Sequence, residues 1–83
     1  MTKELLSNLD KLHTTELGII RIKRNAELKT NDVVSWCKEL IENPKSNIEQ
    51  RGKNWYIRIY DFEITVNAKS YTVITVHKIK EKK

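Results

Sequence analysis

Cysteine, glycine and proline are scarce in this sequence of 83 residues, which contains one cysteine (Cys37), two glycines and one proline. A single cysteine cannot form an internal disulfide, and no cysteine cluster remains for a structural zinc ion. This usage is typical of a reducing compartment, so we expect a cytoplasmic protein. The two glycines build no phosphate-binding loop, and no other cofactor motif is present. We therefore expect no cofactor and no metal.

Long hydrophobic runs are also absent. No segment approaches the roughly 20 apolar residues that a membrane-spanning helix requires, and the N-terminal residues lead into an amphipathic segment rather than the apolar core of a signal peptide. We expect no membrane association. The chain has neither repeats nor a low-complexity linker, so residues 1–83 are expected to form a single domain.

Positive charge is in excess, with 16 Lys and Arg against 11 Asp and Glu and a formal net charge of +5. Such a balance attracts polyanions, for example RNA, DNA or an acidic protein surface. Four of the positive charges lie in residues 78–83, however, and a lysine-rich end is typical of a solvated tail. The rest of the chain is close to neutral, which halves the weight of charge as evidence for nucleic-acid binding.

The first third of the chain has the hydrophobic spacing of two helices. Leucines at positions 5, 6, 9 and 12 predict an amphipathic helix that begins after Thr2 and ends near His13. Thr14 and Thr15 can cap a second helix over residues 17–25. The run of β-branched residues at 19–22 would also suit a strand, but the preceding cap favours a helix.

A third helix has the clearest pattern. A capping cluster at residues 29–32 precedes it, and Asn43-Pro44 ends it, because proline cannot donate to the helical hydrogen-bond ladder. We expect Trp36 to lie buried between this helix and a sheet, and Cys37 to act as a small buried hydrophobe. The apolar face comprises Val33, Val34, Trp36, Cys37, Leu40 and Ile41.

From residue 47 onward the hydrophobic period changes to two, which predicts strands at 48–50, 55–60, 62–67 and 71–78. Helices followed by strands predict an α+β fold, in which two to three N-terminal helices pack on one face of a three- to four-stranded antiparallel sheet. The core is expected to comprise Trp55, Ile57, Ile59, Ile64, Val66, Ile74 and Val76 from the sheet, with Leu9, Leu12, Trp36, Leu40 and Ile41 from the helices.

The other face of the sheet would carry groups that can bind a phosphodiester chain. Tyrosines can stack on bases, and arginine forks match phosphate oxygens in two-point geometry. The candidate nucleic-acid-binding residues are Arg21, Arg24, Lys53, Tyr56, Arg58, Thr65, Asn67, Ser70, Tyr71 and Thr75. Each also has a structural explanation, since exposed arginines are common on helices and strand aromatics are more often packing residues.

His13 and His77 are the only side chains that titrate near neutrality without a special environment, so they are the candidate general acids or bases of a metal-independent reaction. His13 is followed by two threonines that can orient it. The alternative is that His13 binds carbonyls at a helix end, and that His77 belongs to a polar row on the last strand.

Five stretches of the sequence resemble a known family: LDKLHTTELG, RIKRN, DVVSWCK, GKNWY and ITVNAKSYTVIT. Together they are similar to a family of small bacterial and mobile-element proteins of unknown function, over nearly the whole chain. At the level of fold, helices followed by an antiparallel sheet with a polar Thr/Ser/His face resemble the barnase, colicin and RelE-like ribonuclease toxins. Such an analogy does not fix function.

Two functions remain as hypotheses. The first is a small basic protein that binds single-stranded RNA and acts as a metal-independent, toxin-like endoribonuclease, which would have an antitoxin protein as partner. The alternative is a non-catalytic phage- or plasmid-encoded inhibitor that binds a host protein such as a defence nuclease. Convergence of His13, Arg21 and the polar row of residues 65–77 in one cleft would favour the ribonuclease.

Overall fold

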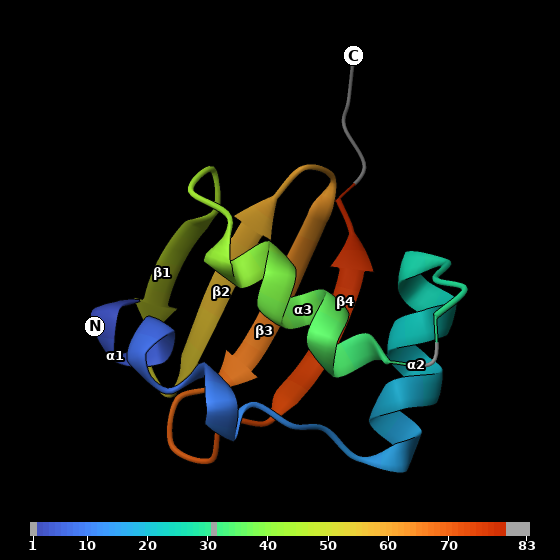
Figure 1. Ribbon diagram of the computed structural model, residues 1–83, viewed down its shortest axis with the longest axis horizontal. Coiled ribbons are helices and arrows are strands. Elements are labelled where there is room, and N and C mark those ends of the chain that lie inside the picture. Colours follow the sequence, from blue (N-terminus) through green and yellow to red (C-terminus); the bar gives the residue numbers. More distant parts are fainter. Residues whose placement is uncertain (1, 31, 80–83) are drawn as a thin grey trace.

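The computed structural model describes residues 2–30 and 32–79 and has an α+β fold (Figure 1). The chain first forms α1 (Thr2–Ser7), the short 3-10 helix η1 (Leu9–Lys11), α2 (Glu16–Ala26) and α3 (Val33–Glu42). The strands follow as β1 (Asn47–Arg51), β2 (Asn54–Ile59), β3 (Phe62–Asn67) and β4 (Val73–Lys78). The predicted fold class is therefore confirmed. The predicted lysine tail lies, from residue 80 onward, outside the described residues.

The four strands form one antiparallel sheet in the order β1-β2-β3-β4. Two-residue turns join β1 to β2 and β2 to β3, because Arg51 pairs with Asn54 and Ile59 with Phe62. Gly52 adopts a φ of +59° in the first of these turns, a backbone conformation that glycine takes without steric cost. Strands that follow one another in the sequence are thus also neighbours in the sheet.

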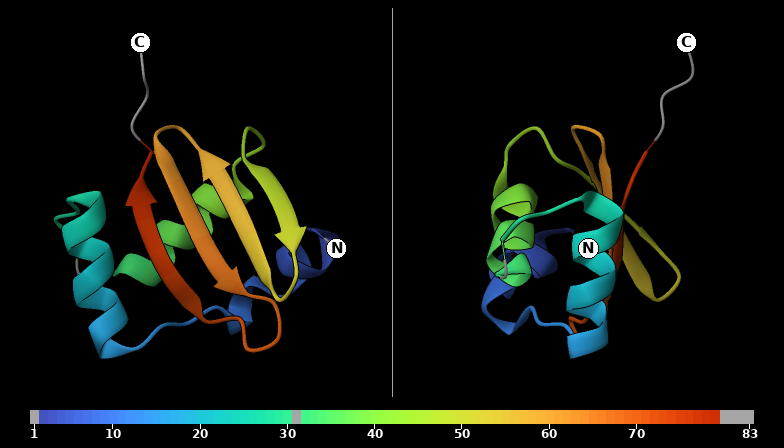
Figure 2. Two further views of the ribbon diagram at one scale, coloured as in Figure 1. Left: turned by 180° about the vertical axis from the view of Figure 1, so that it is seen from behind. Right: turned by 90° about the vertical axis from the view of Figure 1, so that its right-hand side faces the viewer.

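Helices α1 and α3 cover one face of the sheet, and α2 lies alongside β4 (Figure 2). The opposite face of the sheet is covered by none of the described helices, and we call it the open face. Helix α2 is capped by Thr15, whose hydroxyl accepts a hydrogen bond from the N–H of Gly18 at 3.0 Å. Asp32 caps α3 in the same way, accepting from the N–H of Ser35 at 3.2 Å. The predicted helix over residues 17–25 is confirmed.

The hydrophobic core lies between the covered face of the sheet and the helices. Trp36 and Leu40 were expected in its centre but are only partly buried, and Trp36 packs edge-to-face on Phe62 with ring centroids 5.1 Å apart. The fully buried indole is that of Trp55, which is 1% exposed. The core residues are Leu5, Leu9, Leu12, Ile22, Ala26, Val33, Cys37, Ile41, Trp55, Ile57, Ile64, Val66, Val73 and Val76.

Two further local predictions are wrong. The first helix ends at Ser7 rather than near His13, because Leu12 is extended and the residues after it pair with the start of β4. Ile74 is 41% exposed rather than buried. The β3–β4 register shifts between Thr65 and Val66, which leaves Ile74 as an extra residue. Such a bulge breaks the strict alternation on which the prediction depended. Among the described residues, no helix is long and apolar enough to cross a membrane.

Candidate functional site at the turn end of the sheet

One end of the sheet collects the β1–β2 turn, the β3–β4 connection and the segment between η1 and α2 (Figure 1). We call it the turn end. The N–H of His13 donates to the carbonyl oxygen of Tyr71 at 3.1 Å, and the carbonyl oxygen of His13 accepts from the N–H of Val73 at 2.7 Å. His13 thereby forms a parallel bridge with Thr72. A histidine from the helical half is thus fixed at the start of the last strand.

The imidazole of His13 belongs to a chain of hydrogen bonds, which we call the His13 chain. Its Nδ1 lies 2.9 Å from the carbonyl oxygen of Lys11, and its Nε2 lies 3.0 Å from Oγ1 of Thr72. Oγ1 of Thr72 in turn lies 2.7 Å from Oγ of Ser70. A carbonyl can only accept, so in neutral His13 the hydrogen is on Nδ1 and Nε2 is the acceptor. Thr72 therefore donates to Nε2. Ser70 shares its single hydroxyl hydrogen between Oγ1 of Thr72 and Oδ1 of Asn67, which lies 3.2 Å from Oγ of Ser70.

The β3–β4 connection is shaped by the side chain of Asn67. Its Oδ1 accepts the backbone N–H groups of Lys69 at 3.0 Å and of Ser70 at 2.9 Å. This is the local pattern by which asparagine stabilises a turn. The backbone of Asn67 also bonds to Thr72 and Tyr71. Asn67 therefore positions Ser70 and Thr72 for the His13 chain.

A pocket of about 450 Å³ lies between the two turns, and Lys53 and Lys69 are the two cations on its rim. The N–H of Ala68 donates to the carbonyl oxygen of Lys53 at 2.7 Å and holds the turns together. Asn67 lines the pocket and also positions the His13 chain, so the two features adjoin. Ammonium and side-chain amide donors around one hollow suit an anionic ligand. The pocket is lined by Gln50, Gly52, Lys53, Asn67, Ala68 and Lys69.

The two threonines after His13 fix its segment. Thr14 Oγ1 donates to the carbonyl oxygen of Val73 at 2.9 Å, and Thr15 caps α2. A side chain at Gly18 would collide with Oγ1 of Thr14. Glycine at position 18 thus leaves the space in which the Thr14 hydroxyl reaches β4. The threonines were expected to orient His13, but the atoms that contact its imidazole belong to Lys11 and Thr72.

The open face carries five of the predicted residues, and most of them are already engaged. Glu63 accepts from Arg58 Nε at 3.1 Å and lies 3.2 Å from His77 Nε2. The Arg51 guanidinium lies 4.5 Å from the centre of the Tyr56 ring. Because each arginine on this face has a glutamate beside it, the face has little net charge. The five residues are Tyr56, Arg58, Thr65, Thr75 and His77, of which Thr65 is buried at 7% exposure.

The structure separates the two candidate histidines. His13 pairs with Thr72 before the start of β4, whereas His77 lies near the end of that strand. Five residues of extended chain span about 17 Å. The two imidazoles therefore cannot act as an acid–base pair on one phosphodiester.

Three further predicted residues lie apart from the turn-end site. Arg21 and Arg24 are exposed on α2, whereas His13 precedes that helix and pairs with Thr72. Tyr71, with a φ of +62°, precedes β4 and packs on Trp55 with ring centroids 5.4 Å apart, so it is not part of the open face. The turn end unites His13, Lys53, Asn67 and Ser70.

Sequence reasoning missed Thr72 and Lys69. Both residues belong to the polar run around the β3–β4 connection, and such a run is only a weak indication of a functional site. The pairing of Thr72 with His13 spans 59 residues, and no local pattern reports a contact of that range. Among the described residues, no group of three or more His, Cys, Asp and Glu side chains could hold a metal ion.

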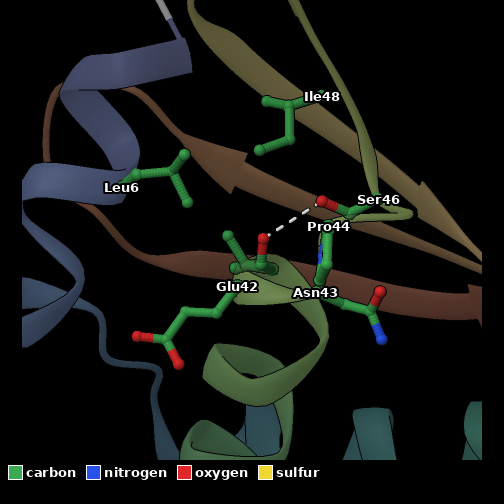
Figure 3. Close-up of a pocket in the computed structure, with 7 residues that line it drawn as sticks. Leu6, Glu42, Asn43, Pro44, Ser46 and Ile48 are labelled. Carbon is green, nitrogen blue, oxygen red and sulfur yellow. Dashed lines mark hydrogen bonds between the residues drawn. The ribbon is translucent and has the colours of Figure 1, made fainter.

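A second hollow, of about 250 Å³, lies beside β1 (Figure 3). Leu6 of α1 and Ile48 of β1 extend into it, and Ser46 Oγ donates to the carbonyl oxygen of Ile41 at 3.1 Å across its floor. Its only ionisable lining residue is Glu42. The hollow therefore offers neither the cations nor the imidazole of the turn end.

Comparisons with curated proteins and with solved structures each found no match. The resemblance to ribonuclease toxins accordingly stays a prediction. One family model, described as a protein of unknown function (DUF3781), matches residues 6–77. This match covers most of the chain, and the protein belongs to that family of unknown function.

Proposed function

We propose that the turn end binds single-stranded RNA. The observation that carries this proposal is the placement of Lys53 and Lys69 on one pocket beside the His13 chain. Neither lysine forms an ion pair with any described residue, so both ammonium groups are available to phosphate. Phosphate contacts by lysine supply most of the affinity of sequence-independent nucleic-acid binding.

Two neighbouring features favour single-stranded RNA over a duplex. The Arg51 guanidinium and the Tyr56 ring are stacked on the open face. Tyr56 is linked to the turn end through Asn54, whose Nδ2 lies 3.4 Å from the tyrosine hydroxyl. Unpaired bases stack on guanidinium and aromatic planes of this kind. The hydroxyls of Ser70 and Thr72 offer partners for a ribose 2′-OH.

Fluorescence anisotropy with labelled RNA and DNA oligonucleotides tests the proposal. The double variant Lys53→Gln/Lys69→Gln should bind RNA more weakly than wild type. The slope of log K against log salt should become shallower by about 1.4, since each phosphate contact on a single strand contributes about 0.7. The matched control is Lys29→Gln/Lys45→Gln, which removes the same charge from exposed positions outside the site.

Two results would contradict the proposal. If both double variants weaken binding equally, the lysines act only through net charge and the pocket is not the site. If wild type fails to bind RNA even at low salt, nucleic-acid binding is excluded. The basic surface would then be assigned to a protein partner, either a host protein such as a defence nuclease or an antitoxin.

Endoribonuclease activity is the second candidate, and the tautomer of His13 favours it. Because Nε2 accepts from Thr72, a bound ribose could pass its 2′-OH proton to His13 either directly or through that hydroxyl. The 2′-oxygen would then bond to the adjacent phosphorus, the P–O5′ bond would break, and the 5′-oxygen would take a proton from water. Lys53 and Lys69 would stabilise the charge that develops on the phosphoryl oxygens.

The two histidines provide a matched pair for testing cleavage. His13→Ala should reduce the rate by on the order of 10²–10⁴, whereas His77→Ala should leave it unchanged, because His77 is held by Glu63 at the other end of β4. Cleavage should persist in EDTA, because no step of the mechanism uses a metal ion. If wild type leaves a broad set of RNAs intact while still binding them, the protein binds RNA without cutting it.

A further inference from the structure

The outward side of α2 exposes two large apolar side chains. Leu17 is 69% exposed and Ile20 is 55% exposed. Successive residues of a helix are rotated by about 100°, so Leu17, Ile20 and Arg24 share one side of α2. The buried side is formed by Gly18, Ile22 and Ala26. The apolar pair therefore points directly away from the core, where nothing else in the described chain covers it.

The charged residues on either side of this apolar pair could form ion pairs with the same residues of a second copy of the chain. Glu16 lies one turn before Ile20 and Arg24 lies one turn after it, and both are exposed. If two copies of α2 packed antiparallel with Ile20 at the centre, Glu16 of each copy would lie opposite Arg24 of the other. An isologous interface requires such self-complementarity, whereas binding to an unrelated partner does not.

We propose that the protein forms a two-fold symmetric dimer through antiparallel packing of α2 on α2 of a second copy. Leu17 and Ile20 of both copies form the apolar centre, and two Glu16–Arg24 ion pairs flank it. The N-terminus of α2 lies at the turn end (Figure 1), so the dimer places its two turn ends at opposite ends and leaves both open faces uncovered. RNA binding at one site is thus compatible with the dimer.

The interface is small, because one helix side buries less than the roughly 1,200–2,000 Å² of stable complexes. Association is therefore expected to be weak. Sedimentation equilibrium of the full chain between micromolar and millimolar concentration should therefore show a monomer–dimer equilibrium. A monomer across the whole range would overturn the proposal and leave the apolar pair to a different partner.

Substitutions distinguish this interface from unspecific hydrophobic association. Leu17→Glu should weaken association at least tenfold, while Leu6→Glu, the same change at an exposed leucine of α1, should leave it unchanged. Equal effects of the two variants would assign association to unspecific hydrophobic contact. Leu17 contributes little to the core, so circular dichroism should show that both variants are folded.

A charge exchange tests the antiparallel register. Glu16→Arg and Arg24→Glu should each weaken association, because each places like charges opposite one another. The double variant restores opposite charges and should recover most of the affinity. Ile20→Cys should give a disulfide-linked dimer under mild oxidation, whereas Leu6→Cys should not. A folded double variant that stays monomeric, or an Ile20→Cys protein that does not cross-link, would refute this arrangement.

Discussion

Cys37 offers a quantitative test of the core. Its thiol is fully buried on the inner side of α3, and this burial raises its pKa from 9.0 to about 12. The thiolate is the reactive species of cysteine. At pH 8 about one folded molecule in 10⁴ would carry a thiolate, against about one in ten of the unfolded molecules. Thiol reagents should therefore modify Cys37 only through unfolding.

The same difference makes stability depend on pH. The folded pKa of Cys37 lies above the unfolded value, so the neutral thiol contributes stability fully below pH 9 and this contribution falls as pH rises toward 12. In that window the unfolded state holds one proton fewer, and stability falls by about 1.4 kcal/mol per pH unit. Between pH 8 and pH 10 the integrated loss is about 1.4 kcal/mol, or about 5–10 °C in melting temperature for a domain of this size.

Urea unfolding at pH 8 and pH 10 measures this loss, and Cys37→Ala is the control. Tyrosine and lysine titration affects both proteins equally, and the cavity left by the substitution affects both pH values equally. The wild type should therefore lose about 1.4 kcal/mol more than Cys37→Ala between the two pH values. Equal losses, or labelling of Cys37 faster than unfolding, would refute the buried placement of the thiol.

Two further predictions concern packing. Trp55→Ala should cost about 3–5 kcal/mol in urea unfolding, whereas Trp36→Ala should cost about half as much because its indole is only partly buried; the reverse order would contradict the packing of the core. Gly18→Ala should destabilise by about 1–2 kcal/mol although alanine is the better helix former, because the added methyl group displaces the Thr14 hydroxyl. Thr14→Ala in the same chain should remove most of that penalty, and a Gly18→Ala protein more stable than wild type would be the contrary result.

Much of the fold could be predicted because local chemistry and tertiary structure agree. Thr15 and Asp32 cap the helices that they were expected to cap, and Pro44 follows the end of α3. The strand predicted over 62–67 has the same bounds as β3. Cap chemistry and hydrophobic period act over a few residues, so a sequence reports them directly.

The predictions that failed depend on contacts between distant parts of the chain. The first helix stops early because the backbone of His13 forms hydrogen bonds with the start of β4, which begins 60 residues further on. The inward position predicted for Ile74 follows from strict alternation, but the bulge beside Val66 changes the register at that point. Neither event leaves a local signal, since both arise when two strands or a strand and a loop meet.

In the candidate site, too, the sequence shows the residue types but not the contacts between distant residues. Residue type alone selected Arg58 as a binding group and His77 as a catalytic group, but the carboxylate of Glu63 lies between them and contacts both. Lys53 and Lys69 are ordinary turn lysines by sequence, yet they line one pocket because Ala68 bonds to Lys53 across the two turns. A cation contributes to phosphate binding only when its charge is not already satisfied by a carboxylate. Support for RNA binding therefore comes from the turn end, where Lys53 and Lys69 form no ion pair with any described residue. In the middle of the sheet, the arginines lie beside glutamates.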